Sequence, residues 1–176
     1  MRISITASGD SKKILRYSKI SEQELEKLVN DLAKLLADKG HEIIIIPSKG
    51  LSYEIAKAYK KYGGKKVIGL VPARDKKYGI KHLESQLNIL DEKIELDTWY
   101  ETSSELAASG DICIVIGISP GIMRIISPLK YKYKFKQAST KLIWFRNTIS
   151  SPIHPEIEED IPITYINSVK DLEKII

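Results

Sequence analysis

Short apolar runs alternate with segments of helical periodicity along the chain. The first, Arg2–Ala7, alternates as a strand does, and residues 41–47 contain four consecutive isoleucines. A β-branched run this short predicts a strand that is covered on both faces, as in a parallel sheet. Similar runs predict further strands at residues 66–72, 93–97, 111–117, 141–146 and 163–166.

Helical patterns lie between these runs. In the clearest one, Ser21 and Glu24 form a capping box and Ile20 can pack on Leu25 as a hydrophobic staple. A stripe of leucines follows, and Gly40 ends the predicted helix. Weaker helical spacing predicts helices over residues 51–62, 80–90 and 99–109, and another at the end of the loop 117–121. A last helix is predicted after Ser168, which together with Asp171 caps its N-terminus.

Strands that are separated by helices predict right-handed βαβ units and a mostly parallel sheet. We therefore expect an α/β protein, a single three-layer Rossmann-like domain over residues 1–176, with no linker that would divide it. Ligands of such sheets bind outside the carboxyl ends of the strands, near the point where the strand order reverses. The loops after the first, second and fifth main strands are the first places to look.

Composition indicates the class of protein, the compartment and the kind of partner that are expected. The fractions of hydrophobic residues (43%) and charged residues (29%) are those of an ordinary globular protein. The single cysteine, Cys113, cannot form an internal disulfide, which favours a reducing compartment. No apolar run approaches ~18 residues and no leader is recognisable, so a cytoplasmic protein with no membrane segment is expected. A net charge of +5 and a pI near 9.1 favour anionic partners.

The common phosphate-binding signatures are missing. No G-x-G-x-x-G occurs, and Gly64-Lys65 fails as a P-loop because residue 59 is tyrosine and residue 66 is lysine. Small residues nevertheless follow three predicted strands, where they would let backbone amides approach a phosphate. The alternative interpretation is three tight turns. The candidate ligand-binding residues in these loops are Ser8, Gly9, Asp10, Ser11, Ser48, Lys49, Gly50, Gly117, Ser119 and Gly121.

Two arginines extend this set of candidates. Arg74 follows the strand 66–72 and is a candidate phosphate contact. Arg124 stands one turn into the helix that follows Gly121, where it would supply a charge for an anionic ligand. Pairing of Arg124 with Glu101 or Glu105 is the alternative.

The order of elements, together with residues 66–72 (Val-Ile-Gly-Leu-Val-Pro after Lys66) and 111–121, resembles the SLOG superfamily. That group includes the LOG phosphoribohydrolases, the molybdenum-cofactor carrier proteins and the Rossmann core of Smf-type DNA-processing proteins. The resemblance spans nearly the whole chain. It implies a Rossmann-like fold, a nucleotide or molybdopterin-like ligand, and pairing into a homodimer.

The catalytic pattern of the LOG enzymes is not kept. Where those enzymes have Pro-Gly-Gly-x-Gly-Thr and then a glutamate, this chain has residues 117–124, with Ile122 lacking a hydroxyl and Arg124 near the place of the acid. The family arginine would fall near residues 99–102, where there is none. The resemblance therefore implies a nucleotide-type binder more strongly than a hydrolase, and whether the chain is an enzyme stays open.

Lysines and aromatic residues alternate at residues 129–136. In an extended conformation this segment puts its lysines on one side and its aromatic rings on the other, as single-stranded nucleic acid would require. An edge or lid segment with solvated lysines, or a protein contact, is the alternative. The residues concerned are Lys130, Tyr131, Lys132, Tyr133 and Lys134, with Phe135 and Lys136 beyond them.

No metal site is expected, because His41, His82 and His154 lack the spacing of ligands. The leading hypothesis is a protein that binds a small phosphorylated ligand without efficient catalysis. The alternatives are a phosphoribohydrolase that acts on nucleoside 5'-monophosphates and a nucleic-acid-associated protein.

Overall fold

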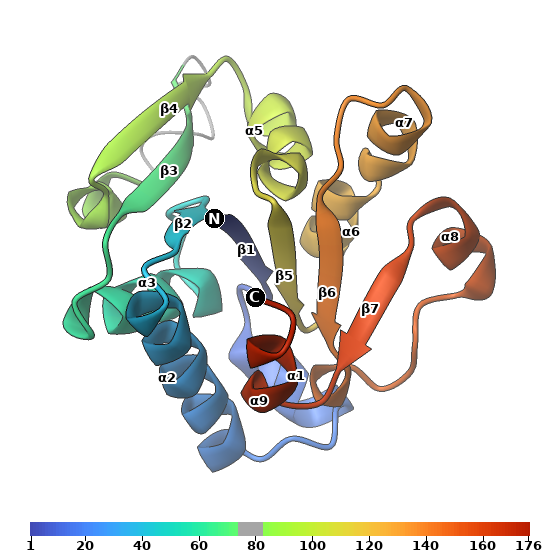
Figure 1. Ribbon diagram of the computed structural model, residues 1–176, viewed down its shortest axis with the longest axis horizontal. Coiled ribbons are helices and arrows are strands. Elements are labelled where there is room, and N and C mark those ends of the chain that lie inside the picture. Colours follow the sequence, from blue (N-terminus) through green and yellow to red (C-terminus); the bar gives the residue numbers. More distant parts are fainter. Residues whose placement is uncertain (74–82) are drawn as a thin grey trace.

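The computed structural model describes residues 1–73 and 83–176. Seven strands within these ranges form one sheet, and each pair of neighbouring strands is parallel. The order is β4-β3-β2-β1-β5-β6-β7 (Figure 1). The strands are β1 (Arg2–Ala7), β2 (Glu42–Ile45), β3 (Val67–Pro72), β4 (Glu92–Leu96), β5 (Ile112–Ile116), β6 (Lys141–Phe145) and β7 (Ile163–Ile166).

Helices cover both faces of this sheet. One face carries α1 (Ser11–Tyr17), α2 (Glu22–Asp38), α3 (Leu51–Lys61) and α9 (Val169–Glu173). The other carries α5 (Trp99–Leu106), α6 (Pro120–Ile126), α7 (Leu129–Lys134) and α8 (Pro155–Asp160). Short 3₁₀ helices complete the chain: η1 (Glu84–Ile89), η2 (Ala107–Ser109) and η3 (Arg146–Thr148). This is the expected three-layer α/β architecture.

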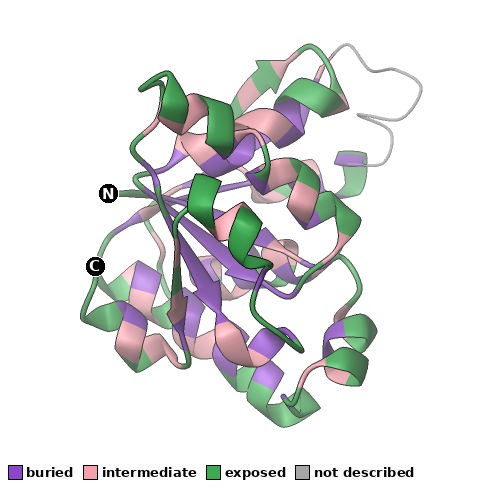
Figure 2. Ribbon diagram, turned by 90° about the vertical axis from the view of Figure 1, so that its right-hand side faces the viewer, coloured by how far each residue is buried: buried purple, intermediate pink, exposed green. Residues whose placement is uncertain are grey.

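Alternate side chains of the buried strands supply the core on both sides of the sheet. On β5, Ile112 and Ile114 belong to the core on the face that carries α1, α2, α3 and α9, whereas Cys113 and Val115 belong to the core on the face that carries α6. The sheet is accordingly buried between helices whose outer surfaces are exposed (Figure 2). Burial raises the pKa of the Cys113 thiol to about 12, so the thiol stays neutral inside the core.

The predicted caps are confirmed. Ser21 and Glu24 make both bonds of a capping box at the start of α2, and Ser168 and Asp171 do the same for α9. Gly40 follows α2 with a φ of 65°, the left-handed conformation that glycine adopts without strain. In the described part of the chain, no helix combines the length and the apolar character that crossing a bilayer requires.

The extended conformation considered for residues 129–136 needs correction, because residues 129–134 form the short helix α7 and Phe135 is its C-cap. Pro128 stands at the N-cap, where its missing N–H costs nothing. Lys130 pairs with Asp160 at 2.6 Å and Lys132 with Glu105 at 2.8 Å. The Tyr133 hydroxyl donates to the Thr140 carbonyl at 2.7 Å.

The alternation of lysines and rings therefore does not persist as two opposite faces. Two of the lysines are held in ion pairs, and Tyr133 is partly buried. Burial raises the pKa of Tyr133 to about 12, which keeps its hydroxyl protonated as a donor. Tyr131 and Phe135 stay about 60% exposed.

Candidate functional site

The strand order reverses between β1 and β5, because the chain builds β2, β3 and β4 on one side of β1 before it returns to the other side. A cavity of about 270 Å³ opens at the carboxyl end of β1, beside this point. A larger groove, of about 480 Å³, lies between α2 and α3. We take the smaller cavity as the candidate site because of its place in the sheet and its chemistry.

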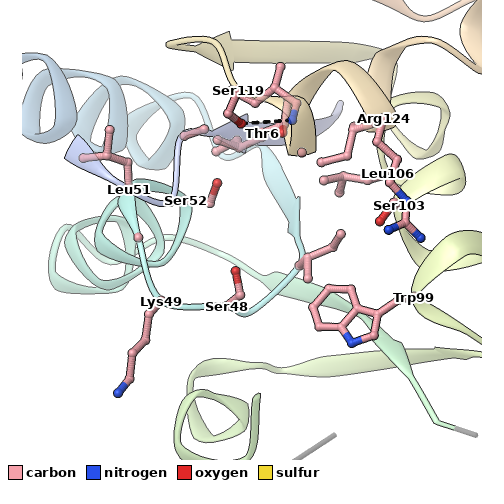
Figure 3. Close-up of a pocket in the computed structure, with 18 residues that line it drawn as sticks. Thr6, Ser48, Lys49, Leu51, Ser52, Trp99, Ser103, Leu106, Ser119 and Arg124 are labelled. Carbon is pink, nitrogen blue, oxygen red and sulfur yellow. Dashed lines mark hydrogen bonds between the residues drawn. The ribbon is translucent and has the colours of Figure 1, made fainter. Parts of the chain in front are cut away.

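One wall of the cavity is the N-terminus of α3. Gly50 is the N-cap residue, and no side chain caps the helix. Within the described residues, the amides of Leu51 and Ser52 have no hydrogen-bond acceptor. Unbonded amides at a helix N-terminus carry part of the positive end of the helix dipole. Figure 3 shows the hydroxyl groups of Ser48 and Ser52 on this wall.

Two glycines bring the loops after β1 and β2 together. Gly50 has a φ of 132°, and a Cβ atom at this position would lie 2.7 Å from the Cα of Gly9. The backbone of the first loop thus rests directly on the start of α3. This contact keeps side chains out of the corner of the cavity between the two loops.

The loop after β5 closes the top of the cavity. Ser119 caps α6 by accepting from the amide of Ile122 at 3.2 Å, and Gly121 lies in the first turn of the helix. Gly117 lies outside the cavity lining. Its amide donates to the Thr148 hydroxyl at 2.8 Å and its carbonyl accepts from the indole of Trp144 at 3.0 Å.

The opposite wall comes from α5 and α6 and combines an apolar surface with one cation. Leu106 and Ile125 are its aliphatic residues, beside the indole of Trp99 and the hydroxyl of Ser103. The guanidinium of Arg124 points to the same side of the cavity as Ser103 (Figure 3). Its carbon stacks over the exposed ring of Tyr100, 5.6 Å from the ring centroid.

The expected alternative partners of Arg124 are engaged elsewhere. Glu101 completes the capping box of α5 and accepts from the amide of Asp97 at 2.8 Å. Glu105 pairs with Lys132. Among residues 1–73 and 83–176, Arg124 has no ion pair, so its N–H donors are available at the rim of the cavity.

The structure brings seven of the predicted site residues to this one cavity, and the side chain of one of them, Lys49, extends away from its centre (Figure 3). Arg74 falls outside the described residues. Ser8, Asp10 and Ser11 do not line the cavity: Ser8 bonds with Asp10, and Asp10 caps α1 through the amide of Lys12 at 3.1 Å. The seven are Gly9, Ser48, Lys49, Gly50, Ser119, Gly121 and Arg124.

The lining also holds residues that sequence reasoning missed. Thr6 lies at the end of β1, and five of the others belong to the α5–α6 wall. The pattern of α5 gives no sign of which strand the helix packs on. The one sequence signal for this wall was the family resemblance, which put a catalytic arginine near residues 99–102. The missed lining residues on that wall are Trp99, Ser103, Leu106, Ile122 and Ile125.

The titratable groups of the site are few. Among the described lining residues, Lys49 and Arg124 are the only ionisable side chains, and neither carboxylate nor imidazole is present. No cluster of three or more potential metal ligands was found in the parts of the chain that the structure describes. The arrangement can bind an anion and a flat apolar group, but this lining supplies no acid–base pair.

No protein-family model and no curated protein matches the sequence. Solved structures match its fold. The structural-genomics protein TM1055 superposes with a TM-score of 0.67 at 17% identity, over 99% of this chain and 96% of that one. The molybdenum cofactor carrier protein of Chlamydomonas reinhardtii gives a TM-score of 0.65 at 18% identity, over 99% and 94%.

The DNA processing protein DprA of Streptococcus pneumoniae is also similar, with a TM-score of 0.60 at 15% identity. The match covers 97% of this chain and 60% of DprA. Identities this low show a common fold. The comparison confirms the predicted Rossmann-like α/β fold, and a molybdenum cofactor carrier protein and a DNA processing protein are among the structures that share it.

Proposed function

We propose that this protein binds a nucleotide or a nucleotide-like phosphorylated small molecule in the cavity between α3 and the α5–α6 wall. One observation carries the proposal. The uncapped N-terminus of α3 faces a wall that holds Trp99 and Arg124, across a cavity at the reversal of strand order.

The polar side of the cavity suits a phosphate. Amides of Leu51 and Ser52, the hydroxyl of Ser48 and the positive end of the α3 dipole supply donors, and no carboxylate of the described lining opposes a negative charge. Gly9 and Gly121 add backbone without side-chain bulk. The net charge of +5 favours the approach of an anion.

The apolar side suits a planar ring. Trp99 offers an aromatic surface, and Leu106 and Ile125 complete the apolar wall around it. The volume of about 270 Å³ lies just below the range of roughly 300–1,000 Å³ that is usual for small-molecule sites. A ligand of mononucleotide size fits this space better than a dinucleotide does.

A molybdopterin-like compound belongs among the candidates. The carrier protein from C. reinhardtii, which shares the fold, binds molybdenum cofactor according to its name. Such a compound also joins a flat ring system to a phosphate. The same two walls would therefore serve it.

Catalysis is a weaker proposal. Hydrolysis of an N-glycosidic bond needs a general acid or base, and the described lining has only Lys49 and Arg124 as ionisable groups. A phosphoribohydrolase would release ribose 5-phosphate and a free base from AMP. Absence of both products in a prolonged incubation would exclude this alternative.

Nucleic acid is the other alternative, since DprA shares the fold. The α7 segment offers fewer free cations than its sequence implied, because Lys130 and Lys132 are paired. If single-stranded DNA binds there, its affinity should fall steeply with salt, and the double variant Lys134→Ala and Lys136→Ala should flatten that dependence.

A ligand panel tests the main proposal. Thermal unfolding is followed with AMP, cyclic nucleotides, ADP-ribose, a molybdopterin-like compound and inorganic phosphate. A ligand at about 100 times its Kd stabilises the native protein by about 2.7 kcal/mol. Ser52→Ala, in the cavity, should weaken the effect, and Ser104→Ala, on the outer side of α5, should not. No stabilisation by any of these compounds would refute the proposal.

The proposal includes a homodimer in a reducing compartment such as the cytoplasm. The fully buried Cys113 is compatible with such a compartment, since it has no exposed thiol to oxidise. Sedimentation at several protein concentrations would give the oligomeric state.

A further inference from the structure

We infer that the ring bound in this cavity is a 6-oxopurine, as in GMP or IMP, and that Arg124 selects it over adenine. This inference rests on the proposed function and specifies its ligand. It follows from the hydrogen-bonding character of the wall on which the ring would lie.

The guanidinium of Arg124 contacts the ring of Tyr100, and in the described chain no carboxylate neutralises its charge. The guanidinium carbon lies 5.6 Å from the centroid of the Tyr100 ring, and this attraction between cation and ring uses none of its N–H donors. Within the described chain no carboxylate pairs with it, because Glu101 and Glu105 bond elsewhere. Arg124 thus presents a fork of donors next to the apolar wall.

The neighbours of Arg124 decide what that fork can recognise. Trp99 lies on the same wall, so a ring packed against this surface would bring its edge to the guanidinium (Figure 3). Guanine and hypoxanthine present two adjacent acceptors, O6 and N7, and arginine bonds both at once. Adenine presents an amino donor at position 6, which would oppose another donor.

The rest of the described lining offers adenine little compensation. Reading the amino group of adenine takes an acceptor, and the side chains near Trp99 supply only the hydroxyl of Ser103 beside the donor-only Arg124. A donor that faces a donor is a repulsive element, and such elements discriminate as effectively as attractive ones. A bidentate contact of this kind is worth about tenfold in affinity.

Calorimetric titrations with GMP, IMP, AMP and ribose 5-phosphate test the inference. GMP and IMP should bind about tenfold more tightly than AMP. Arg124→Ala should bring all three within about threefold of one another and leave ribose 5-phosphate unaffected. Arg16→Ala, an exposed arginine of α1 that is remote from the lining, is the control and should keep the preference.

Tyr100 gives a second test that does not alter the charge. Both Tyr100 and Arg124 are exposed, so substitution should not unfold the protein. Tyr100→Phe keeps the ring and should keep the preference for GMP, whereas Tyr100→Leu should reduce it about threefold or more.

The outcomes separate the two proposals. Equal affinities for AMP and GMP, or equal losses for all ligands including ribose 5-phosphate in Arg124→Ala, would overturn the 6-oxopurine inference and leave nucleotide binding in place. If none of the four compounds binds but another compound of the thermal-unfolding panel does, the 6-oxopurine inference alone is refuted. If no compound of either set binds, the proposed function is refuted as well.

Discussion

The Cα atom of Gly9 occupies the space that a side chain at Gly50 would need, with only 2.7 Å between that atom and the position of a Cβ on residue 50. Gly50 also has a φ of 132°, a conformation that L-residues avoid. The first two loops of the site are therefore fitted to each other through backbone alone. A glycine is needed at position 50 by both geometry and space.

Gly50→Ala should lower the free energy of unfolding by at least about 2 kcal/mol, since it combines backbone strain with a clash against backbone. Gly63→Ala is the matched control. Gly63 has a φ of 77° but nothing within 4 Å of its Cβ position, so only the conformational cost of about 1 kcal/mol applies. Urea unfolding measures both variants, and equal losses would show that the contact with Gly9 is unimportant.

Gly121→Ala should separate stability from binding. The new Cβ would meet only the Ser119 hydroxyl, at an ordinary 3.6 Å, and alanine in the first turn of α6 is preferred over glycine. We expect stability that is unchanged or higher by up to about 1 kcal/mol. The methyl group would stand in the cavity lining, so the thermal shift given by the best ligand should shrink. An undiminished shift would place the ligand elsewhere.

Lys136→Gly should stabilise the protein. Lys136 is the one non-glycine residue with positive φ (55°) among those described, and it follows α7 where glycine usually ends a helix. The Gln137 amide bonds the Lys132 carbonyl at 2.7 Å across this turn. Removing the strain should gain about 1 kcal/mol in urea unfolding. Lys134→Gly, inside α7, should instead lose about as much.

Acid should destabilise the protein in part through His41. Burial lowers the pKa of this imidazole below its ordinary value of 6.5, and its Nε2 has no hydrogen-bond partner in the described structure. As the pH falls through 6.5 the unfolded chain binds a proton that the native protein resists, so the free energy of unfolding decreases. His41→Gln should flatten this decrease between pH 7.5 and 5.5. An unchanged slope in urea unfolding across that range would rule His41 out.

Much of the fold follows from local signals. The capping boxes at Ser21 and Ser168 each start a helix where the pattern predicts one, and the isoleucine run becomes the buried strand β2. Each of these signals lies within a few consecutive residues. A short β-branched run that is buried on both faces fits a central strand of a parallel sheet. The parallel pairing of the strands and the place of the cavity at their carboxyl ends follow from the alternation of strands and helices, whereas the strand order comes from the structure.

The far wall of the cavity and the form of α7 depend on contacts that no local pattern records. Trp99 and Ser103 reach the site because α5 packs beside α6, and Thr148 holds the amide of Gly117 from 31 residues away. In α7 an alternating pattern predicted an extended segment. In the structure this segment is helical, and Lys132 pairs with Glu105, which lies 27 residues away in the sequence.

The central place of β1 has a consequence for synthesis on the ribosome. Ser4 meets Ile112 across 108 residues of chain, so one edge of the first strand stays open until β5 has emerged. An open parallel edge is a site for wrong pairing with other chains. Gly50, at the α3 wall of the cavity, is synthesised before β5, and Arg124, on the α5–α6 wall, is synthesised after it. A nascent chain that stops short of β5 would have an unprotected strand and only part of a binding site.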